Sequence, residues 1–134
     1  LLAVRVDGSG DVPRSHIEWR LTRGAPLTPS PILVGNELYI VSDLGIATCG
    51  NALTGELHWQ ERVGGNHSAS PIFANGHIYF QNEEGITTVI KPGAEFQVLA
   101  RNQLEGSMLA SMAAVDSALY IRTESHLYRI EETP

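Results

Sequence analysis

Short apolar runs follow one another along the whole chain, and each run ends at a cluster of Gly, Asn, Asp or Ser residues. Apolar runs of this length between turn residues predict β-strands joined by tight turns. A tyrosine returns in the same setting three times, in Leu38-Tyr39-Ile40, Ile78-Tyr79-Phe80 and Leu119-Tyr120-Ile121. The segments before these tyrosines also align without a gap, so the chain repeats itself with a period of about 40 residues, the length of one β-propeller blade.

Each repeat is expected to form a four-stranded antiparallel blade. In the best-preserved repeat the strands are expected at 31–34, 38–41, 46–49 and 56–62, with Gly or Asn at each intervening turn. We therefore predict an all-β partial propeller of about three blades. Its expected parts are the end of one blade (1–29), two complete blades (30–69 and 70–110) and a last blade without its outer strand (111–134).

A ring of blades needs more than this chain supplies. Closed propellers usually contain about four to eight blades, and a single blade cannot bury both faces of its sheet without neighbours. The sequence is therefore interpreted as the carboxyl-terminal part of a longer propeller, or as a unit that closes its ring by self-association. The missing outer strand of the last blade would come from the opposite terminus, since proteins seldom leave a strand edge unpaired.

Composition excludes several classes of function. The formal net charge is −6 and no basic cluster is present, which argues against nucleic-acid binding. No apolar run is long enough to cross a bilayer, so direct membrane insertion is not expected. Cys49 is the only cysteine, so this segment has no internal disulfide and no multi-cysteine metal site, and Cys49 is predicted to pack in the core.

One segment carries a family resemblance. Residues 49–59, with Asn51, Thr54, Gly55 and Trp59, resemble the Ala-x-Asp-x-x-Thr-Gly-x-x-x-Trp docking motif of PQQ-like (pyrroloquinoline quinone) β-propeller repeats. Such repeats occur in quinoprotein dehydrogenases and in BamB-type outer-membrane assembly lipoproteins, and they fit this chain better than WD40 or kelch repeats. The resemblance implies that Trp59, and Trp19 one repeat earlier, pack against the adjacent blade. The chain departs from the motif at Asn51, at 91–95 and at Leu99, which stands where a third tryptophan is expected.

Two function classes follow from the resemblance. In the first, the chain is a non-catalytic, BamB-like platform for protein or ligand contacts, with no cofactor in this segment. In the alternative, it belongs to a PQQ-dependent quinoprotein dehydrogenase whose calcium ligands, catalytic aspartate and adjacent cysteine pair lie elsewhere. Either family member would be periplasmic or secreted. The residues themselves show no nucleophile elbow, phosphate-binding loop or paired catalytic carboxylates.

A candidate binding face comes from superposing the repeats. Asp43, Glu83 and Glu124 fall at equivalent turns in three successive repeats, and Glu84 follows one of them. These turns are expected to share a face with the links that join consecutive blades, where Arg23, Asn66 and His67 lie. An acidic arc there would suit a cationic peptide segment or a divalent ion. The alternative is that turns simply favour Asp and Glu in water, and that His67 is a surface histidine, since no histidine pair has metal-ligand spacing.

Overall fold

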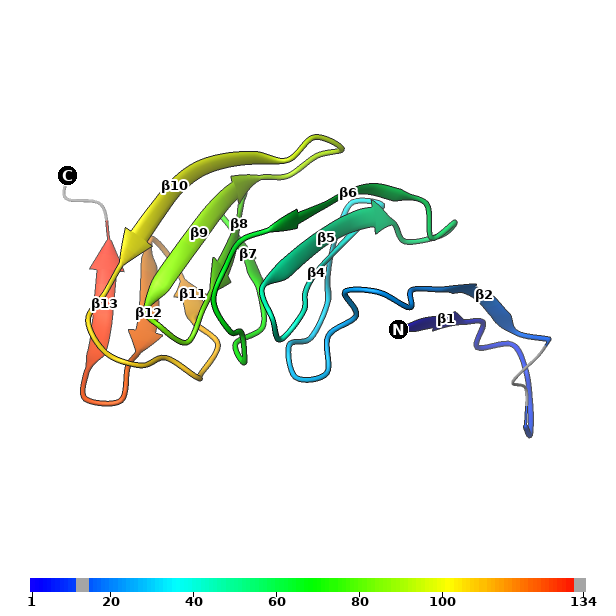
Figure 1. Cartoon of the computed structure of the whole chain (residues 1–134), viewed down its shortest axis with the longest axis horizontal. Helices are drawn as coiled ribbons and strands as arrows, with labels where there is room; N and C mark the ends of the chain where they lie inside the picture. The colour runs from blue at the N-terminus through cyan, green and yellow to red at the C-terminus, as the bar shows by residue number, and fades with distance from the viewer. Residues whose placement is uncertain (12–14, 132–134) are drawn as a thin grey trace.

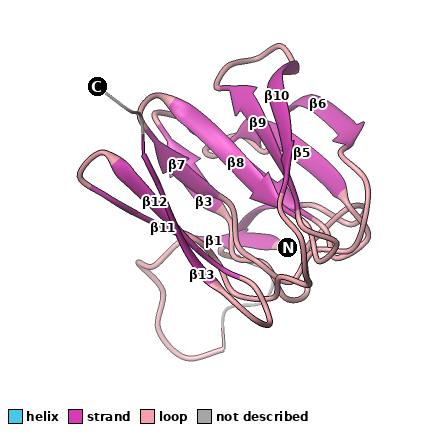
Figure 2. Ribbon diagram, turned by 90° about the vertical axis from the view of Figure 1, so that its left-hand side faces the viewer, coloured by secondary structure: helices cyan, strands magenta, loops and turns pink. Residues whose placement is uncertain are grey.

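The computed structural model describes residues 1–11 and 15–131, and this part of the chain forms thirteen β-strands and no helix. The strands are drawn in magenta in Figure 2, where the sheets stack face to face. An all-β chain of sheets packed side by side is the predicted fold class.

Consecutive strands pair with one another in antiparallel order, so each sheet is a meander. The first sheet contains β1 (Leu2–Val4) and β2 (Ile17–Arg20). The second contains β3 (Ile32–Val34), β4 (Glu37–Val41), β5 (Ile46–Asn51) and β6 (Leu57–Arg62). The third contains β7 (Ile72–Ala74), β8 (His77–Gln81), β9 (Ile86–Lys91) and β10 (Gln97–Gln103), and the fourth contains β11 (Ala113–Val115), β12 (Ala118–Arg122) and β13 (Leu127–Glu131).

The four sheets follow one another along an arc, from the N-terminal pair at the right of Figure 1 to the red β13 at its left. The first strands approach one another most closely, because β3 contacts β7 and β7 contacts β11. These strands therefore lie on the inner side of the arc, as in a propeller whose ring is incomplete. Within the described residues, β13 has no partner strand on its second edge.

A serine at the start of each inner strand joins neighbouring sheets. The amide of Ser30 donates to the hydroxyl of Ser70 at 2.9 Å, and the amide of Ser70 donates to the hydroxyl of Ser111 at 2.9 Å. The three serines occupy the same position in successive repeats. The repeat therefore supplies its own inter-sheet hydrogen bond, and this bond fixes the spacing of the inner strands.

Turn residues explain where the hairpins close. The β7–β8 connection contains Asn75 and Gly76, with φ of 46° and 75°. Two successive residues with positive φ form the type I′ geometry that matches the twist of a hairpin, and Asn-Gly is the pair that adopts it most readily. In the fourth sheet Asp116 replaces the asparagine with φ of 53°, which is tolerable because Asp also enters the left-handed region.

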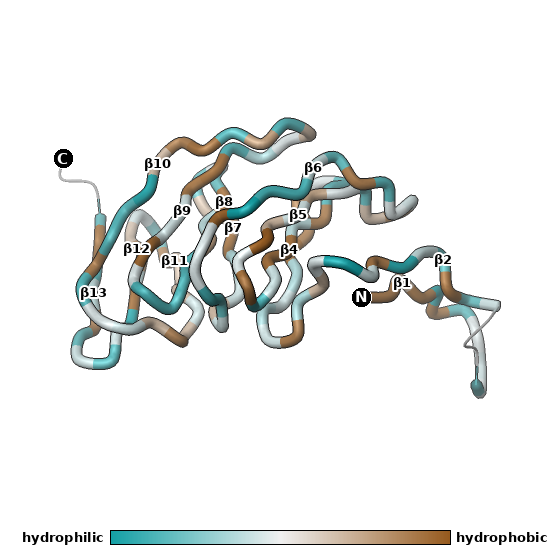
Figure 3. Tube along the Cα trace, viewed as in Figure 1, coloured by the Kyte–Doolittle hydropathy of each residue, from teal (hydrophilic) through white to brown (hydrophobic). Residues whose placement is uncertain are grey.

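Apolar side chains fill the spaces between sheets. The brown segments of β4, β5, β8 and β9 in Figure 3 lie inside the stack. The largest cluster lies between the second and third sheets, and a smaller cluster lies between the third and fourth sheets. The larger one consists of Tyr39, Val41, Ala47, Cys49, Trp59, Val63, Ile78, Phe80 and Ile90. The smaller one has Met108, Met112 and Ile121 as its buried members.

The structure revises one alignment made from the sequence. In the second sheet Trp59 pairs with Cys49. Val89 is the counterpart of Cys49 in the third sheet, and it pairs with Ala100. Leu99 is instead the bulged residue between Val98 and Ala100, and its side chain is 45% exposed. The second sheet has the equivalent bulge at His58, so the extra residue of the third sheet lies between Ile90 and Val98, where the chain turns from β9 to β10. This residue also accounts for the change in spacing from 40 to 41. Ala100, not Leu99, stands where the tryptophan is expected.

Candidate functional site

Trp59 docks on the turn between β9 and β10 of the next sheet. Its indole Nε1 donates to the carbonyl oxygen of Gly93 at 3.1 Å, and its ring lies 4.9 Å from that of Phe96. The hydroxyl of Tyr39 accepts a hydrogen bond from the Gly93 amide at 2.8 Å, and Cys49 Sγ donates to the Gly93 carbonyl at 3.7 Å. Three side chains of the second sheet therefore hold the backbone of one residue, Gly93, of the third sheet.

The same contact occurs one sheet earlier. Trp19 Nε1 donates to the carbonyl oxygen of Ala52 at 2.9 Å. A Cβ added to Gly55 would lie 2.5 Å from Trp19 Cγ, so only glycine lets the indole lie against this turn. Asn51 shapes the turn, because its Oδ1 accepts from the amides of Leu53 and Thr54 at 2.9 and 3.0 Å, while Thr54 Oγ1 accepts from the Glu56 amide.

Burial changes the acidity of the groups that hold Gly93. Desolvation raises the pKa of Tyr39 to about 12 and the pKa of Cys49 to about 11. Both groups are therefore neutral at physiological pH, and the Cys49 thiol is fully buried. A protonated, inaccessible thiol is a poor nucleophile, so these side chains serve packing.

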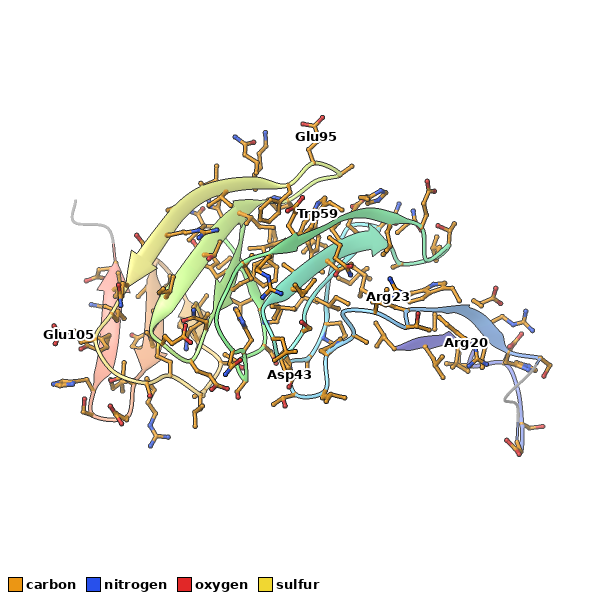
Figure 4. All side chains as sticks on the ribbon, viewed as in Figure 1. Arg20, Arg23, Asp43, Trp59, Glu95 and Glu105 are labelled. Atoms are coloured by element: carbon orange, nitrogen blue, oxygen red, sulfur yellow. The ribbon has the colours of Figure 1, made fainter. Side chains whose placement is uncertain are left out.

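The opposite end of the sheets carries the turns and links of the candidate binding face. Asp43 lies there, at the far end of β4 and β5 from Trp59, as Figure 4 shows. The amide of His67 donates to the carbonyl of Asp43 at 2.9 Å, and the amide of Glu83 donates to the carbonyl of Asn66 at 2.8 Å. The link therefore bonds to the turns of both sheets that it joins. This pattern recurs at the next link, where the Met108 amide donates to the carbonyl of Glu83 and the Glu124 amide donates to the carbonyl of Ser107.

The carboxylates on this face are not equivalent. Asp43 accepts from the amides of Leu27 and Thr28 at 2.7 and 3.2 Å, and the hydrogen bond from the Leu27 amide is the main cause that lowers its pKa. Glu83 accepts a short hydrogen bond of 2.5 Å from Ser68 Oγ. Glu124 makes no side-chain hydrogen bond within residues 1–11 and 15–131. Two of the three carboxylates thus hold links in place.

His67 differs from the sequence prediction of a surface histidine. Its side chain is 2% exposed, and its Nδ1 has no hydrogen-bond partner in the described structure. It occupies the position of Met108, which is also buried in the next repeat. Burial lowers the pKa of His67, although a hydrogen bond to the Gly65 backbone and the charges of Glu84 and Glu83 act in the opposite direction.

The remaining residues of the predicted face lie at its surface. Arg23, labelled in Figure 4, is exposed and its carbonyl oxygen accepts from Gln60 Nε2 at 3.4 Å. Asn66 and Glu84 are exposed as well. Sequence reasoning missed Asn82, whose Oδ1 accepts from the amides of Glu84 and Ile86. Its counterparts in the aligned repeats are Ser42 and Thr123, which accept from Ile46 and His126 amides, so the shared acceptor was visible in the alignment.

Among the described residues, no group of three His, Cys, Asp or Glu side chains is placed to hold a metal ion. The same part of the chain contains no helix that could cross a membrane.

Comparisons with known proteins point to the fold alone. No family model matches the chain, and no curated protein matches its sequence. The chain is similar in structure to the crystal structure of BamB from Moraxella catarrhalis, with a TM-score of 0.57 and 16% sequence identity over 69% of this chain. It spans 28% of the length of that BamB chain. The similarity supports the partial β-propeller and its relationship to a BamB propeller.

Proposed function

We propose that this chain is a non-catalytic, PQQ-like propeller segment, and that it offers its turn-and-link face as a rigid platform for a protein partner. The observation that carries the proposal is that each link forms backbone hydrogen bonds to the turns on both sides of it. The His67 amide bonds to the Asp43 carbonyl, and the Met108 amide bonds to the Glu83 carbonyl. Binding side chains on a rigid scaffold lose little conformational entropy when a partner docks.

The engagement of the potentially reactive groups supports a non-catalytic role. Cys49, Tyr39 and Trp59 hold the Gly93 peptide, and the pKa of each of the first two is raised by burial. The likeness to BamB, together with the docking motif at 49–59, favours a protein as the partner. The partner would contact the exposed polar side chains of the face, which are Arg23, Asn66, Glu84 and Glu124.

Site-directed photo-cross-linking tests the platform. Leu44 and Leu53 lie just beyond opposite ends of β5 and are 70% and 75% exposed, so they report on the two ends of one sheet with equal accessibility. A photoreactive residue at Leu44, in cells that express the protein, is expected to give a cross-linked product of discrete mass. Leu53 should give none. Equal products from both positions, or none from Leu44, would contradict the proposal.

A second measurement separates this function from quinoprotein catalysis. Thermal unfolding is followed with and without PQQ and calcium ions. A ligand that binds only the folded chain raises its melting temperature. No shift is expected for the platform, whereas a saturable, calcium-dependent shift would favour the dehydrogenase reading.

A further inference from the structure

The second and third sheets differ in the space between the outer strand of the sheet and the link that precedes it. This space lies between β6 and the link at Gly24 in the second sheet, and between β10 and the link at Gly64 in the third. In the second sheet Gln60 fills this place. Its Nε2 donates to Thr48 Oγ1 at 3.0 Å and to the Arg23 carbonyl at 3.4 Å. A Cβ added to Gly24 would lie 2.7 Å from the same nitrogen. The link and the outer strand are therefore closed against each other.

In the third sheet the same place is open. Arg101 pairs with Thr88 as Gln60 pairs with Thr48, so Arg101 is the counterpart of Gln60. Gly64 is the counterpart of Gly24, yet a Cβ added to Gly64 would meet nothing within 4 Å. A groove of about 280 Å³ occupies the space. Its lining consists of Val63, Gly64, Gly65, Asn82, Glu84, Ile86, Arg101, Asn102 and Gln103.

One charge in the groove is held and the other is available. Glu84 Oε2 accepts from Asn82 Nδ2 at 3.1 Å, and Asn82 is itself fixed because it is 3% exposed and caps the turn. The guanidinium groups of Arg5, Arg62 and Arg129 are hydrogen-bonded. By contrast, the exposed Arg101 side chain makes no hydrogen bond or ion pair within the part of the chain that the structure describes.

We propose that this groove binds an extended segment of a protein partner, with a carboxylate of the segment on Arg101 and a cationic side chain on Glu84. The inference rests on the proposed platform function and locates one contact on it. A guanidinium binds a carboxylate through two parallel hydrogen bonds. The opposite charge of Glu84 then sets the direction of the bound segment, because a reversed segment would place like charges together.

The size of the groove favours a short segment. Small-molecule pockets are usually about 300–1,000 Å³, so this groove lies at the lower limit. It accommodates a few side chains, not a folded element. In an extended segment, alternate side chains point to the same face, so a cationic and an acidic residue two positions apart would both face the groove.

A peptide titration tests the groove. The probe is acetyl-Gly-Lys-Gly-Asp-Gly-amide, added to the ¹⁵N-labelled 134-residue chain while backbone amide shifts are recorded. We expect saturable shifts confined to 63–65, 82–86 and 101–103. The matched variant is Arg101→Gln, which introduces the residue that closes the second sheet. It should keep the fold, since the amide can reach Thr88 as Gln60 reaches Thr48, and it should weaken binding at least about tenfold.

The control variant is Arg20→Gln. Arg20 occupies the corresponding position of the first sheet, is exposed, and does not line the groove. This change should leave the peptide affinity unaltered. The second variant, Glu84→Gln, is tested with a peptide that has Asp in place of Lys. This peptide should bind Glu84→Gln as well as the original probe does, because the variant removes the repulsion between the Glu84 carboxylate and the added Asp.

Three results would overturn the inference: no shifts up to about 10 mM peptide, unchanged affinity in Arg101→Gln, or equal loss in Arg20→Gln. If the titration fails while the Leu44 cross-link persists, the groove assignment is wrong and the platform stands. If the Leu44 cross-link is also absent, the platform itself is wrong.

Discussion

The interface between the second and third sheets and the interface between the third and fourth sheets have the same design but different content. The first has nine buried apolar residues, including Trp59, and the second has three. At the first, Tyr39 and Trp59 hold the Gly93 peptide, whereas Ala100 stands at the tryptophan position of the third sheet. The common repeat therefore determines where neighbouring sheets contact each other. The side chain at the tryptophan position determines how much that contact stabilises the pair of sheets.

Removing the indole at the stronger interface should have the largest effect. Trp59→Ala deletes a buried side chain and leaves the Gly93 carbonyl with only the long, weak hydrogen bond from the Cys49 thiol. We expect a loss of about 3–5 kcal/mol in the free energy of unfolding, from the cavity and the lost hydrogen bond. Urea unfolding measures it. The control is Leu99→Ala on exposed β10, with an expected loss below about 1 kcal/mol; equal losses would refute the comparison.

The earlier tryptophan contact can be tested through a pair of glycines. Gly55 and Gly76 have φ of 74° and 75°, so an alanine pays the same conformational cost of about 1 kcal/mol at either position. Only Gly55 lies against Trp19, since a Cβ at Gly76 would meet nothing within 4 Å. Gly55→Ala should therefore destabilise by about 2 kcal/mol more than Gly76→Ala. Tryptophan fluorescence should also shift to the red in Gly55→Ala alone.

His67 and Met108 provide a comparison of one position in two repeats. Burial lowers the pKa of folded His67 below its unfolded value, so the unfolded chain binds more protons as the pH falls through about 6.5. Stability should therefore fall as the pH drops from neutral toward the folded pKa. His67→Met should remove this part of the pH dependence and add about 1 kcal/mol at neutral pH, because the unpartnered Nδ1 is replaced.

The measurement is urea unfolding between about pH 5 and 8, with the control His77→Met on a half-buried strand position. An identical pH slope in the wild-type chain and in His67→Met would show that His67 does not titrate on unfolding.

The smallest effect is expected at the turn carboxylates. Asp43 accepts two link amides and its pKa is lowered by the hydrogen bond from Leu27. Its contribution is present above the unfolded pKa and is lost as the pH falls through the folded value. Asp43→Asn should cost less than about 1 kcal/mol, since the side chain is only half-buried. Glu124→Gln should cost nothing measurable by urea unfolding at neutral pH, and equal costs would contradict the structural role of Asp43.

The period of the apolar runs predicted the fold class, because a sheet with two apolar faces requires neighbours on both sides. Cys49 was also predicted to be buried, and it is fully buried. The burial of His67 could not be read from its link, since Leu27, His67 and Met108 share one position but differ in polarity and exposure. The burial of this link position depends on which side chains of the flanking sheets cover it.

The sequence by itself determined the spacing of strands, the turn residues and the identity of the docking side chains, because these depend on local periodicity and backbone conformation. The tertiary structure decided which side chains meet. It shifted the tryptophan position from Leu99 to Ala100 through one extra residue between β9 and β10, tied Asp43 to a link, and left an open groove at Arg101 where Gln60 closes its counterpart. Contacts between sheets depend on register and on packing across about 40 residues of chain, and neither is encoded within one strand.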